Sequence, residues 1–201
     1  MYIYGACGYG RAVREILALK GVDVKAYIDH DYLDSFLDDL PVLHEAVSDT
    51  EMVVALNDSE ARRLVVNNLR MYGVRYGSAI HPSAIVSPSA EIGEGAIIMP
   101  GAIINAHARI GAHCVISTGA IVGYECELGD FVTMSPRSIL CGGVSVGRGT
   151  HICAGATVTP DVNVGRWSVV GAGTVCLHDI PDGVVVAGDD AAVIKYQEII
   201  D

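Results

Sequence analysis

The chain has 201 residues and a mass of 21.1 kDa, which is long enough for two small domains that each have a core. It carries 24 acidic and 13 basic side chains, and the formal net charge of −11 argues against a surface for nucleic acid or anionic lipid, because either would need a basic face. No apolar run reaches the length of a membrane span, and the segment after Met1 lacks the basic region of a signal peptide. We therefore expect a cytoplasmic protein with no nucleic-acid and no membrane partner.

Residues 1–77 are predicted to form a small Rossmann-like α/β domain. Short apolar runs in this part of the chain predict strands, and amphipathic stretches predict helices. In chain order the elements are a strand at 2–5, a helix at 11–20, strands at 22–28 and 51–56, and a helix at 59–71 that Asn57 and Asp58 could cap. The order strand, helix, strand at the start indicates a βαβ unit.

The turn of this unit is the segment 5–10, Gly-Ala-Cys-Gly-Tyr-Gly. Glycines such as Gly8 and Gly10 would let a phosphate approach the N-terminus of the helix, and Asp29 at the end of the second strand could bind a ribose hydroxyl. The domain is too small for a full dinucleotide fold but could hold a mononucleotide. The spacing is GxxGxG and not GxGxxG, so the alternative is a packing unit whose glycines serve only the turn.

Residues 78–183 follow a six-residue repeat. Every sixth residue from Ile80 to Cys176 is aliphatic or sulfur-bearing, without an insertion, and a second row of mostly small residues from Ala84 to Thr174 lies two positions earlier. Residues two apart on a strand share a face, so each hexamer sends one small and one large side chain inward. Such repeats resemble those of the left-handed parallel β-helix, a three-sided prism with one hexamer on each side.

The end of the repeat and the cysteines complete the predicted architecture. Residues 181–183, Pro-Asp-Gly, close the repeat, and residues 184–201 are expected to form a cap with a short C-terminal helix from about 191 to 200. Of the six cysteines, Cys114, Cys126 and Cys176 occupy inward positions, so reduced and buried thiols are expected. The chain has no CxxC or HExxH motif, and no metal site is predicted.

Several segments together carry a resemblance to a known family; they are 5–11, 27–29, 53–57, 80–84, the hexamers and 184–188. The chain resembles the sugar O-acyltransferases of the sialic acid O-acetyltransferase type, which include N-acetyltransferases of UDP-4-amino-sugars in bacterial glycan synthesis. The resemblance implies that the first domain holds a UDP-sugar and that the prism forms a homotrimer with acetyl-CoA between neighbouring subunits. The substrate-binding residues would be Gly8, Gly10, Asp29 and Asn57, and the cofactor-binding residues would be Gly142, Gly155, Ala172 and Gly188.

The family's catalytic histidine is replaced in this chain. The resemblance places that histidine at Tyr124, before Glu125, and a second histidine at Thr133. A tyrosine with a pKa near 10 is a poor base at neutral pH, and the neighbouring Glu125 would raise that pKa further. His107 lies 18 residues before Glu125, one coil away on the same corner, and could act as a base paired with that carboxylate. The alternative for His107 is an ordinary solvent-facing corner residue.

The segment that would contact the donor also departs from the family pattern. Residues 188–192, Gly-Asp-Asp-Ala-Ala, stand where the resemblance implies a proline turn and a lysine, so two carboxylates would lie near the phosphates of the donor and weaken its binding. Arg137 adds a bulky side chain to the same region.

Two functions therefore remain open from the sequence. The first is an acyl-CoA-dependent, acetyl-transferring enzyme that acts on a nucleotide-linked or other sugar in surface polysaccharide or glycan biosynthesis, with Glu125, Tyr124 and His107 as its catalytic candidates. The second is a catalytically inactive member of the family that binds a nucleotide-sugar or serves as a scaffolding trimer. An acceptor other than a sugar also stays open, because a fold does not fix a substrate.

Overall fold

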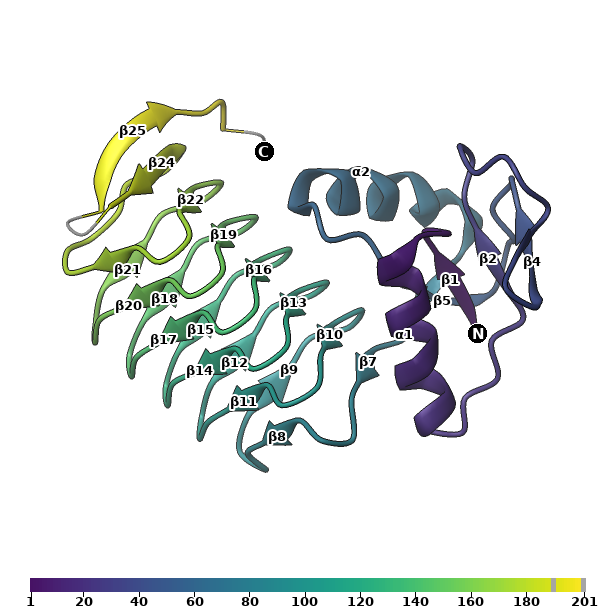
Figure 1. Ribbon diagram of the computed structural model, residues 1–201, viewed down its shortest axis with the longest axis horizontal. Coiled ribbons are helices and arrows are strands. Elements are labelled where there is room, and N and C mark those ends of the chain that lie inside the picture. The colour runs from purple at the N-terminus through teal and green to yellow at the C-terminus, as the bar shows by residue number, and fades with distance from the viewer. Residues whose placement is uncertain (189–190, 200–201) are drawn as a thin grey trace.

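The computed structural model describes residues 1–188 and 191–199, and it contains a small α/β domain beside a three-sided β-helix (Figure 1). The α/β domain has one sheet with the strand order β3-β4-β2-β1-β5-β6. Its elements are β1 (Tyr2–Tyr4), α1 (Gly8–Leu19), β2 (Ala26–Ile28), β3 (Phe36–Leu37), β4 (Leu40–Leu43), β5 (Glu51–Val54), α2 (Ser59–Leu69), the short 3-10 helix η1 (Arg70–Tyr72) and β6 (Arg75–Tyr76). Within the described residues, no helix is long and apolar enough to cross a membrane.

The two helices cover opposite faces of this sheet. Val13 and Leu17 of α1 pack with Ile3 on one face, whereas Val66 and Leu69 of α2 pack on the other. The α1 face also contacts the outer surface of the first β-helix strands, so α1 lies between the two domains (Figure 1). The predicted βαβ unit and the helix from Ser59 are therefore confirmed.

The hairpin of β3 and β4 was not predicted from the sequence. The two strands pair antiparallel, and β4 then adds to β2 in parallel. Asp38 and Asp39 form the connection, with Asp38 at φ +56, in place of the glycine that usually marks such a turn. Leu37 and Val42 contribute to the core, so the hairpin is a packed part of the domain.

The second domain is a left-handed parallel β-helix, as predicted, built from three parallel sheets. Strands one coil apart pair with an offset of 18 residues, as for Ile98 and Ile116. The strands are β7 (Ala79–Ile80), β8 (Ile85–Val86), β9 (Glu91–Ile92), β10 (Ile97–Ile98), β11 (Ile103–Ile104), β12 (Arg109–Ile110), β13 (Val115–Ile116), β14 (Ile121–Val122), β15 (Glu127–Leu128), β16 (Thr133–Met134), β17 (Ile139–Leu140), β18 (Ser145–Val146), β19 (His151–Ile152), β20 (Thr157–Val158), β21 (Asn163–Val164), β22 (Val169–Val170) and β23 (Val175–Cys176).

We call the sheets by the order in which the chain visits them: sheet 1 starts at β7, sheet 2 at β8 and sheet 3 at β9. Corner 1–2 joins sheets 1 and 2, corner 2–3 joins sheets 2 and 3, and corner 3–1 returns to sheet 1. At the corners a glycine follows the large inward residue; a Cβ on Gly123 would lie 2.6 Å from the carbonyl carbon of Cys141 in the next coil. Glycine at these positions therefore allows successive corners to stack this closely.

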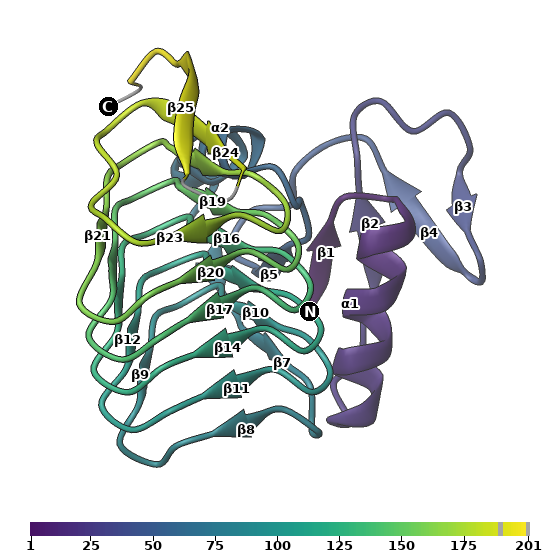
Figure 2. The same cartoon turned by 60° about the vertical axis from the view of Figure 1, so that its left-hand side comes forward.

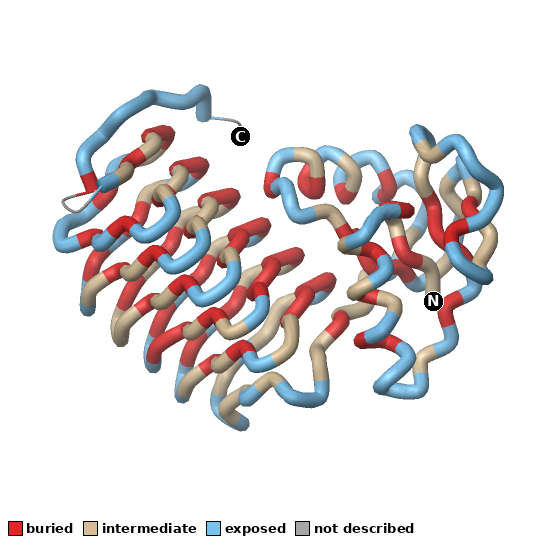
Figure 3. Tube along the Cα trace, viewed as in Figure 1, coloured by how far each residue is buried: buried red, intermediate tan, exposed pale blue. Residues whose placement is uncertain are grey.

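The interior of the prism is filled by the two predicted rows of side chains, which are only partly buried in the first coil and buried in the coils that follow (Figure 3). Cys114, Cys126 and Cys176 lie inside as free thiols. Cys114 and Cys126 donate weak hydrogen bonds to carbonyls 15 residues further along the chain, at 3.1 and 3.0 Å. Burial raises the pKa of the Cys114 thiol to about 12, so this group is a core filler and not a nucleophile.

The C-terminal cap differs from its prediction. The chain forms β24 (Val184–Ala187), which extends sheet 1, and then β25 (Ala192–Tyr196), which pairs antiparallel with β24. The expected helix from about 191 to 200 is therefore wrong over Ala192–Tyr196, and Ile200 lies outside the described residues. The physical reason is that β24 has a free strand edge. The segment with the β-branched residues Val193 and Ile194 favours a strand, and it pairs with this edge.

Arg62 of α2 joins the two domains. Its side chain is 0% exposed, and its guanidinium donates to the carbonyls of His113 (2.8 Å) and Phe131 (2.9 Å) and to the hydroxyl of Thr133 (2.9 Å), all in the β-helix. The same group donates to the carbonyl of Leu56, at 2.7 Å, in its own domain. Burial lowers the pKa of Arg62, so these oxygens must stabilise a cation that has left water.

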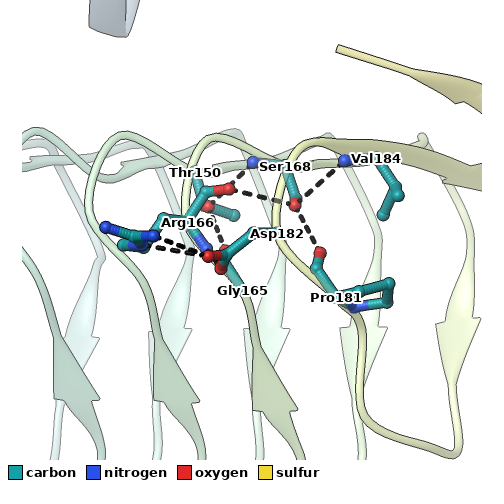
Figure 4. Close-up of polar contacts among 7 residues, drawn as sticks. All are labelled: Thr150, Gly165, Arg166, Ser168, Pro181, Asp182 and Val184. Carbon is teal, nitrogen blue, oxygen red and sulfur yellow. Dashed lines mark hydrogen bonds and ion pairs between the residues drawn. The ribbon is translucent and has the colours of Figure 1, made fainter. Parts of the chain in front are cut away.

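A polar network closes the last coil at corner 3–1 (Figure 4). The Asp182 carboxylate accepts from the backbone N–H of Arg166 at 2.5 Å and from its guanidinium at 3.0 and 2.9 Å. Ser168 donates to the carbonyl of Pro181 at 2.8 Å and accepts from the N–H of Val184 at 3.3 Å. Bonds of the same kind join earlier coils, for example from the N–H of Ser168 to the Thr150 hydroxyl at 3.1 Å, so this network fastens the last coil to the one before it.

Replacing Arg62 is expected to loosen the junction. In Arg62→Ala, the buried carbonyls of His113 and Phe131 lose their donor, and each such loss costs about 1–3 kcal/mol. We expect the free energy of unfolding, measured by urea titration, to fall by about 3 kcal/mol or more. Arg70→Ala, a control at an exposed position, should change it by less than about 0.5 kcal/mol. A loss below about 1 kcal/mol for Arg62→Ala would show that the junction does not depend on this side chain.

Replacing Asp182 is expected to have a pH-dependent effect. The backbone N–H of Arg166, followed by its side chain, lowers the pKa of Asp182 below its usual value of 3.8. A carboxylate with a lowered pKa in the folded state stabilises the fold above the usual pKa, and this contribution is lost as pH falls through the folded-state pKa. Asp182→Asn should therefore lower the melting temperature at pH 7. Because the site is partly exposed, the loss should be equivalent to about 1 kcal/mol or less. The difference in melting temperature between the variant and the wild type should shrink below about pH 4. Asp34→Asn, at an exposed position, is the control. If the melting-temperature difference between Asp182→Asn and the wild type stays constant down to about pH 2, the ion pair does not stabilise the fold in this way.

Candidate functional site

The carboxyl ends of β1, β2 and β5 meet at one edge of the α/β sheet, which we call the nucleotide edge. The N–H of Ala6 donates to the Asp29 carboxylate at 2.8 Å, and the N–H of Asp31 donates to its other oxygen at 3.1 Å. The structure thus brings Asp29 to the glycine turn, as predicted. Its first role is to hold this turn in place, and each oxygen keeps a lone pair for a ligand.

The two predicted glycines of the turn differ in their surroundings. Gly8 is the first residue of α1, is exposed, and has no atom within 4 Å of a Cβ built on it. Gly10 is buried, and a Cβ there would collide with the carbonyl oxygen of Gly5. Gly8 can therefore face a ligand at the helix N-terminus, whereas Gly10 is required for the close contact between α1 and β1.

Asn57 follows β5 at the same edge. Its side chain is exposed, while its carbonyl accepts from Arg62 at 3.1 Å and from the Thr133 hydroxyl at 3.1 Å. Asp58 caps α2 by accepting from the N–H of Ala61 at 2.7 Å. The nucleotide edge is thus fastened directly to the outer surface of sheet 1.

The catalytic candidates lie on corner 2–3. Tyr124 is 60% exposed, and its ring covers Gly142 of the next coil, so a Cβ on Gly142 would collide with it. Glu125 and His107 stack one coil apart, both with φ +58, and both are exposed. Among the described residues, no hydrogen bond or ion pair joins His107 to Glu125, so their pairing stays a prediction.

The remaining cofactor candidates lie on or near corner 1–2. Gly155, Ala172 and Gly188 follow one another in successive coils, and a Cβ on Gly155 or Gly188 would meet no atom within 4 Å. Arg137 is exposed on the same corner, one coil below Gly155. This corner therefore offers a smooth and accessible backbone with one nearby cation. Of the segment 188–192, Asp189 and Asp190 lie outside the described residues.

The nucleotide edge and the corner that carries Tyr124 do not meet within one chain. The α/β domain docks on sheet 1 and corner 3–1, where Tyr76 contacts His113 edge to face and His113 stacks on Phe131. Corner 2–3, which carries Tyr124, lies across the prism from this junction (Figure 2). A nucleotide edge and a Tyr124 corner can therefore face one another only between two copies of the chain.

The seam between the domains contains polar side chains that the sequence did not predict as site residues; it indicated Thr133 only as the residue in place of the family's second histidine. Thr133 is 0% exposed and shares a hydrogen bond with the Ser59 hydroxyl at 3.0 Å. On the adjacent strand, His151 Nε2 lies 2.7 Å from the Ser135 hydroxyl. A small cavity of about 130 Å³ opens beside His151, between the start of α2 and sheet 1. The signal that could have found His151 is its spacing of 18 residues from Thr133.

His113, which also lies at the seam, is unsuited to catalysis. Burial and the neighbouring Arg62 lower its pKa to about 4, and it is enclosed between aromatic rings. No group of three or more His, Cys, Asp or Glu side chains in the described part of the chain is arranged to hold a metal ion.

Comparison with known proteins matches both domains. The family of PglD N-terminal domains matches residues 1–69, and the family of bacterial transferase hexapeptides (six repeats) matches residues 89–124. A comparison with curated proteins finds no match.

Solved structures match nearly the whole chain. A histidine-to-asparagine variant of perosamine N-acetyltransferase from Caulobacter crescentus, in complex with CoA and GDP-perosamine, is 37% identical, with 96% of each chain covered and a TM-score of 0.90. The acetyltransferase domain of PglB from Neisseria gonorrhoeae FA1090, in complex with acetyl coenzyme A, is 31% identical over 96% of this chain and 98% of that chain, with a TM-score of 0.89. WeeI from Acinetobacter baumannii AYE, at 24% identity over 96% of this chain and 98% of that chain and a TM-score of 0.81, shares the fold.

Identity above 30% over almost the full length of both chains, with the same two domains in the same order, goes beyond a shared fold. The chain belongs to the bacterial hexapeptide-repeat sugar acetyltransferases that carry a PglD-type N-terminal domain.

Proposed function

We propose that this protein transfers the acetyl group of acetyl-CoA to a nucleotide-linked amino sugar during glycan biosynthesis. The observation that supports this most is the near full-length likeness to an enzyme crystallised with CoA and GDP-perosamine. Transfer to an amine agrees with that neighbour better than the O-acetylation from which the wider sialic acid O-acetyltransferase family takes its name.

The nucleotide would bind at the nucleotide edge. The exposed Gly8 at the N-terminus of α1 offers backbone N–H groups to a diphosphate, and the free lone pairs of Asp29 can accept from a ribose hydroxyl. Asn57 presents its side chain to the same space. We propose a UDP-sugar as the substrate, with a GDP-sugar as the alternative that the Caulobacter neighbour suggests.

Acetyl-CoA would lie along corner 1–2. At Gly155 and Gly188 the backbone carries no side chain, so the extended chain of the cofactor could lie against it. Arg137 would supply a cation for the phosphates of the cofactor. When bound, the cofactor supplies an acetyl thioester that an amine can attack. Gly142 is covered by Tyr124 and would contact the cofactor only after that ring moved.

A homotrimer would complete the site. The outer face of sheet 2 is a ladder of mostly aliphatic side chains in a chain with a net charge of −11; it comprises Ile85 (64% exposed), Ile103, Ile121, Ile139, Thr157 and Val175 (37% exposed). Sheet 3, by contrast, presents charged and polar residues, for example Arg109 and Glu127. An apolar ladder of this length indicates a protein contact, and a second copy of the chain could use it to bring Tyr124 and Glu125 to the seam of its neighbour.

The direct test of the function is acetyl transfer by the purified protein. With UDP- or GDP-linked amino sugars as acceptors, we expect the protein to release free CoA from acetyl-CoA. A thiol reagent measures this release. If Glu125 binds the acceptor, Glu125→Gln should lower kcat/KM about tenfold or more, the effect expected for losing a hydrogen bond to a charged group. Glu91→Gln on sheet 3 is the matched control and should change little. No transfer to any such acceptor would instead support the inactive, nucleotide-sugar-binding alternative that the replacement of the family histidine by Tyr124 suggests.

The trimer is tested by placing a charge in the aliphatic ladder. The wild-type protein is expected to have three times the chain mass of 21.1 kDa by light scattering. Ile139→Asp should dissociate it, because an ionised carboxylate would be buried without a partner. Ser145→Asp on sheet 3 should leave the trimer intact. A monomeric wild type, or a trimer that tolerates Ile139→Asp, would contradict the proposed interface.

A further inference from the structure

The chain contains seven histidines, all among the described residues, and they differ sharply in their surroundings. His113 is enclosed by aromatic rings and is unsuited to proton transfer. Five others lie at the surface or on turns; these are His30, His44, His81, His107 and His178. His151 differs from all of these because it lines a cavity between the two domains, where its ring contacts the Ser135 hydroxyl.

The position of His151 links the two predicted binding regions. It begins β19 on the outer face of sheet 1, paired with Thr133 of β16, and the Thr133 hydroxyl donates to the carbonyl of Asn57. His151 is therefore one strand from the nucleotide edge. Its partner Ser135 lies on corner 1–2, one coil below the turn that holds Gly155. The imidazole thus stands between the predicted nucleotide edge and the predicted donor corner.

Burial, more than the nearby charges, favours the neutral form of the His151 ring. Burial lowers the pKa of His151; Asp58 opposes this shift and Arg62 adds to it. The other charged side chains that line the cavity are Glu60 from α2 and Glu198 from the C-terminal segment. A neutral imidazole at neutral pH has a lone pair that can accept a proton.

We propose that His151 is the proton acceptor of the acetyl transfer, in place of the histidine that Tyr124 replaces, and that Ser135 positions its ring. This proposal rests on the function proposed above. As the sugar nitrogen bonds to the thioester carbonyl carbon, its proton passes to His151, the carbon–sulfur bond breaks, and the proton is then delivered to the departing thiolate to give free CoA. The step consumes no other reactant, and the ring returns to its neutral state.

The test compares His151→Gln with the wild type and with His178→Gln, an exposed histidine on corner 2–3. Glutamine can keep a hydrogen bond to Ser135 but cannot accept the proton, so we expect kcat to fall by about 100-fold or more, as for the loss of a general base, with KM changed less than about threefold. His178→Gln should match the wild type. CoA binding by calorimetry and the melting temperature verify that the variant is folded, and His151→Asn is the second variant if it is not.

Two readouts separate proton transfer from a structural role. In the wild type, kcat/KM should decline as pH falls through a pKa below 6.5, and this limb should be absent in His151→Gln. The NMR signal of the His151 ring, identified by its absence from the variant, should titrate in the same range. A ring that titrates above 6.5, or a folded variant with more than half of the wild-type kcat, overturns the assignment and leaves the proposed function standing. A wild type without transfer activity overturns both.

Discussion

The 18-residue register between parallel coils determines where every functional side chain of the β-helix lies. Because each strand contributes only two residues, a shift of one position would turn the inward rows outward and move each corner residue off its column. The register places Ser135 and Gly155 on successive turns of corner 1–2, and it sets His151 beside Thr133. Packing of small and large inward side chains holds this register, so the core of the prism also fixes the geometry of its surface.

A buried cation connects this regular scaffold to the less regular α/β domain. Arg62 reaches three β-helix residues and at the same time fixes the turn that carries Asn57, so the position of the nucleotide edge depends on it. All of the oxygens that it contacts are uncharged, and the site is rigid because none of these hydrogen bonds can be given up without exposing a buried polar group. The same contacts therefore also hold in place the neighbouring part of the seam, which contains His151 and the start of α2.

Much of the fold follows from the sequence because it depends on periodicity. The hexamers predicted the inward rows, the corners and the buried cysteines, and the glycine turn predicted α1 and the position of Asp29. The hairpin of β3 and β4 and the final strand β25 escaped prediction, because each is stabilised by pairing with a neighbouring strand edge and not by a local pattern. The site was predicted less completely: Thr133 and His151 matter through contacts with Ser59, Asn57 and Ser135, which lie far away in the chain or on another coil.

We infer from these features together that the acceptor sugar meets the donor at the seam between the domains. A crystal structure with CoA and a nucleotide-linked amino sugar tests it most directly. We expect the diphosphate at the N-terminus of α1, CoA along corner 1–2, and the sugar nitrogen within about 3.2 Å of His151 Nε2, the reach of a general base. A sugar bound with its nitrogen far from this ring, or CoA bound along a different corner, would contradict it.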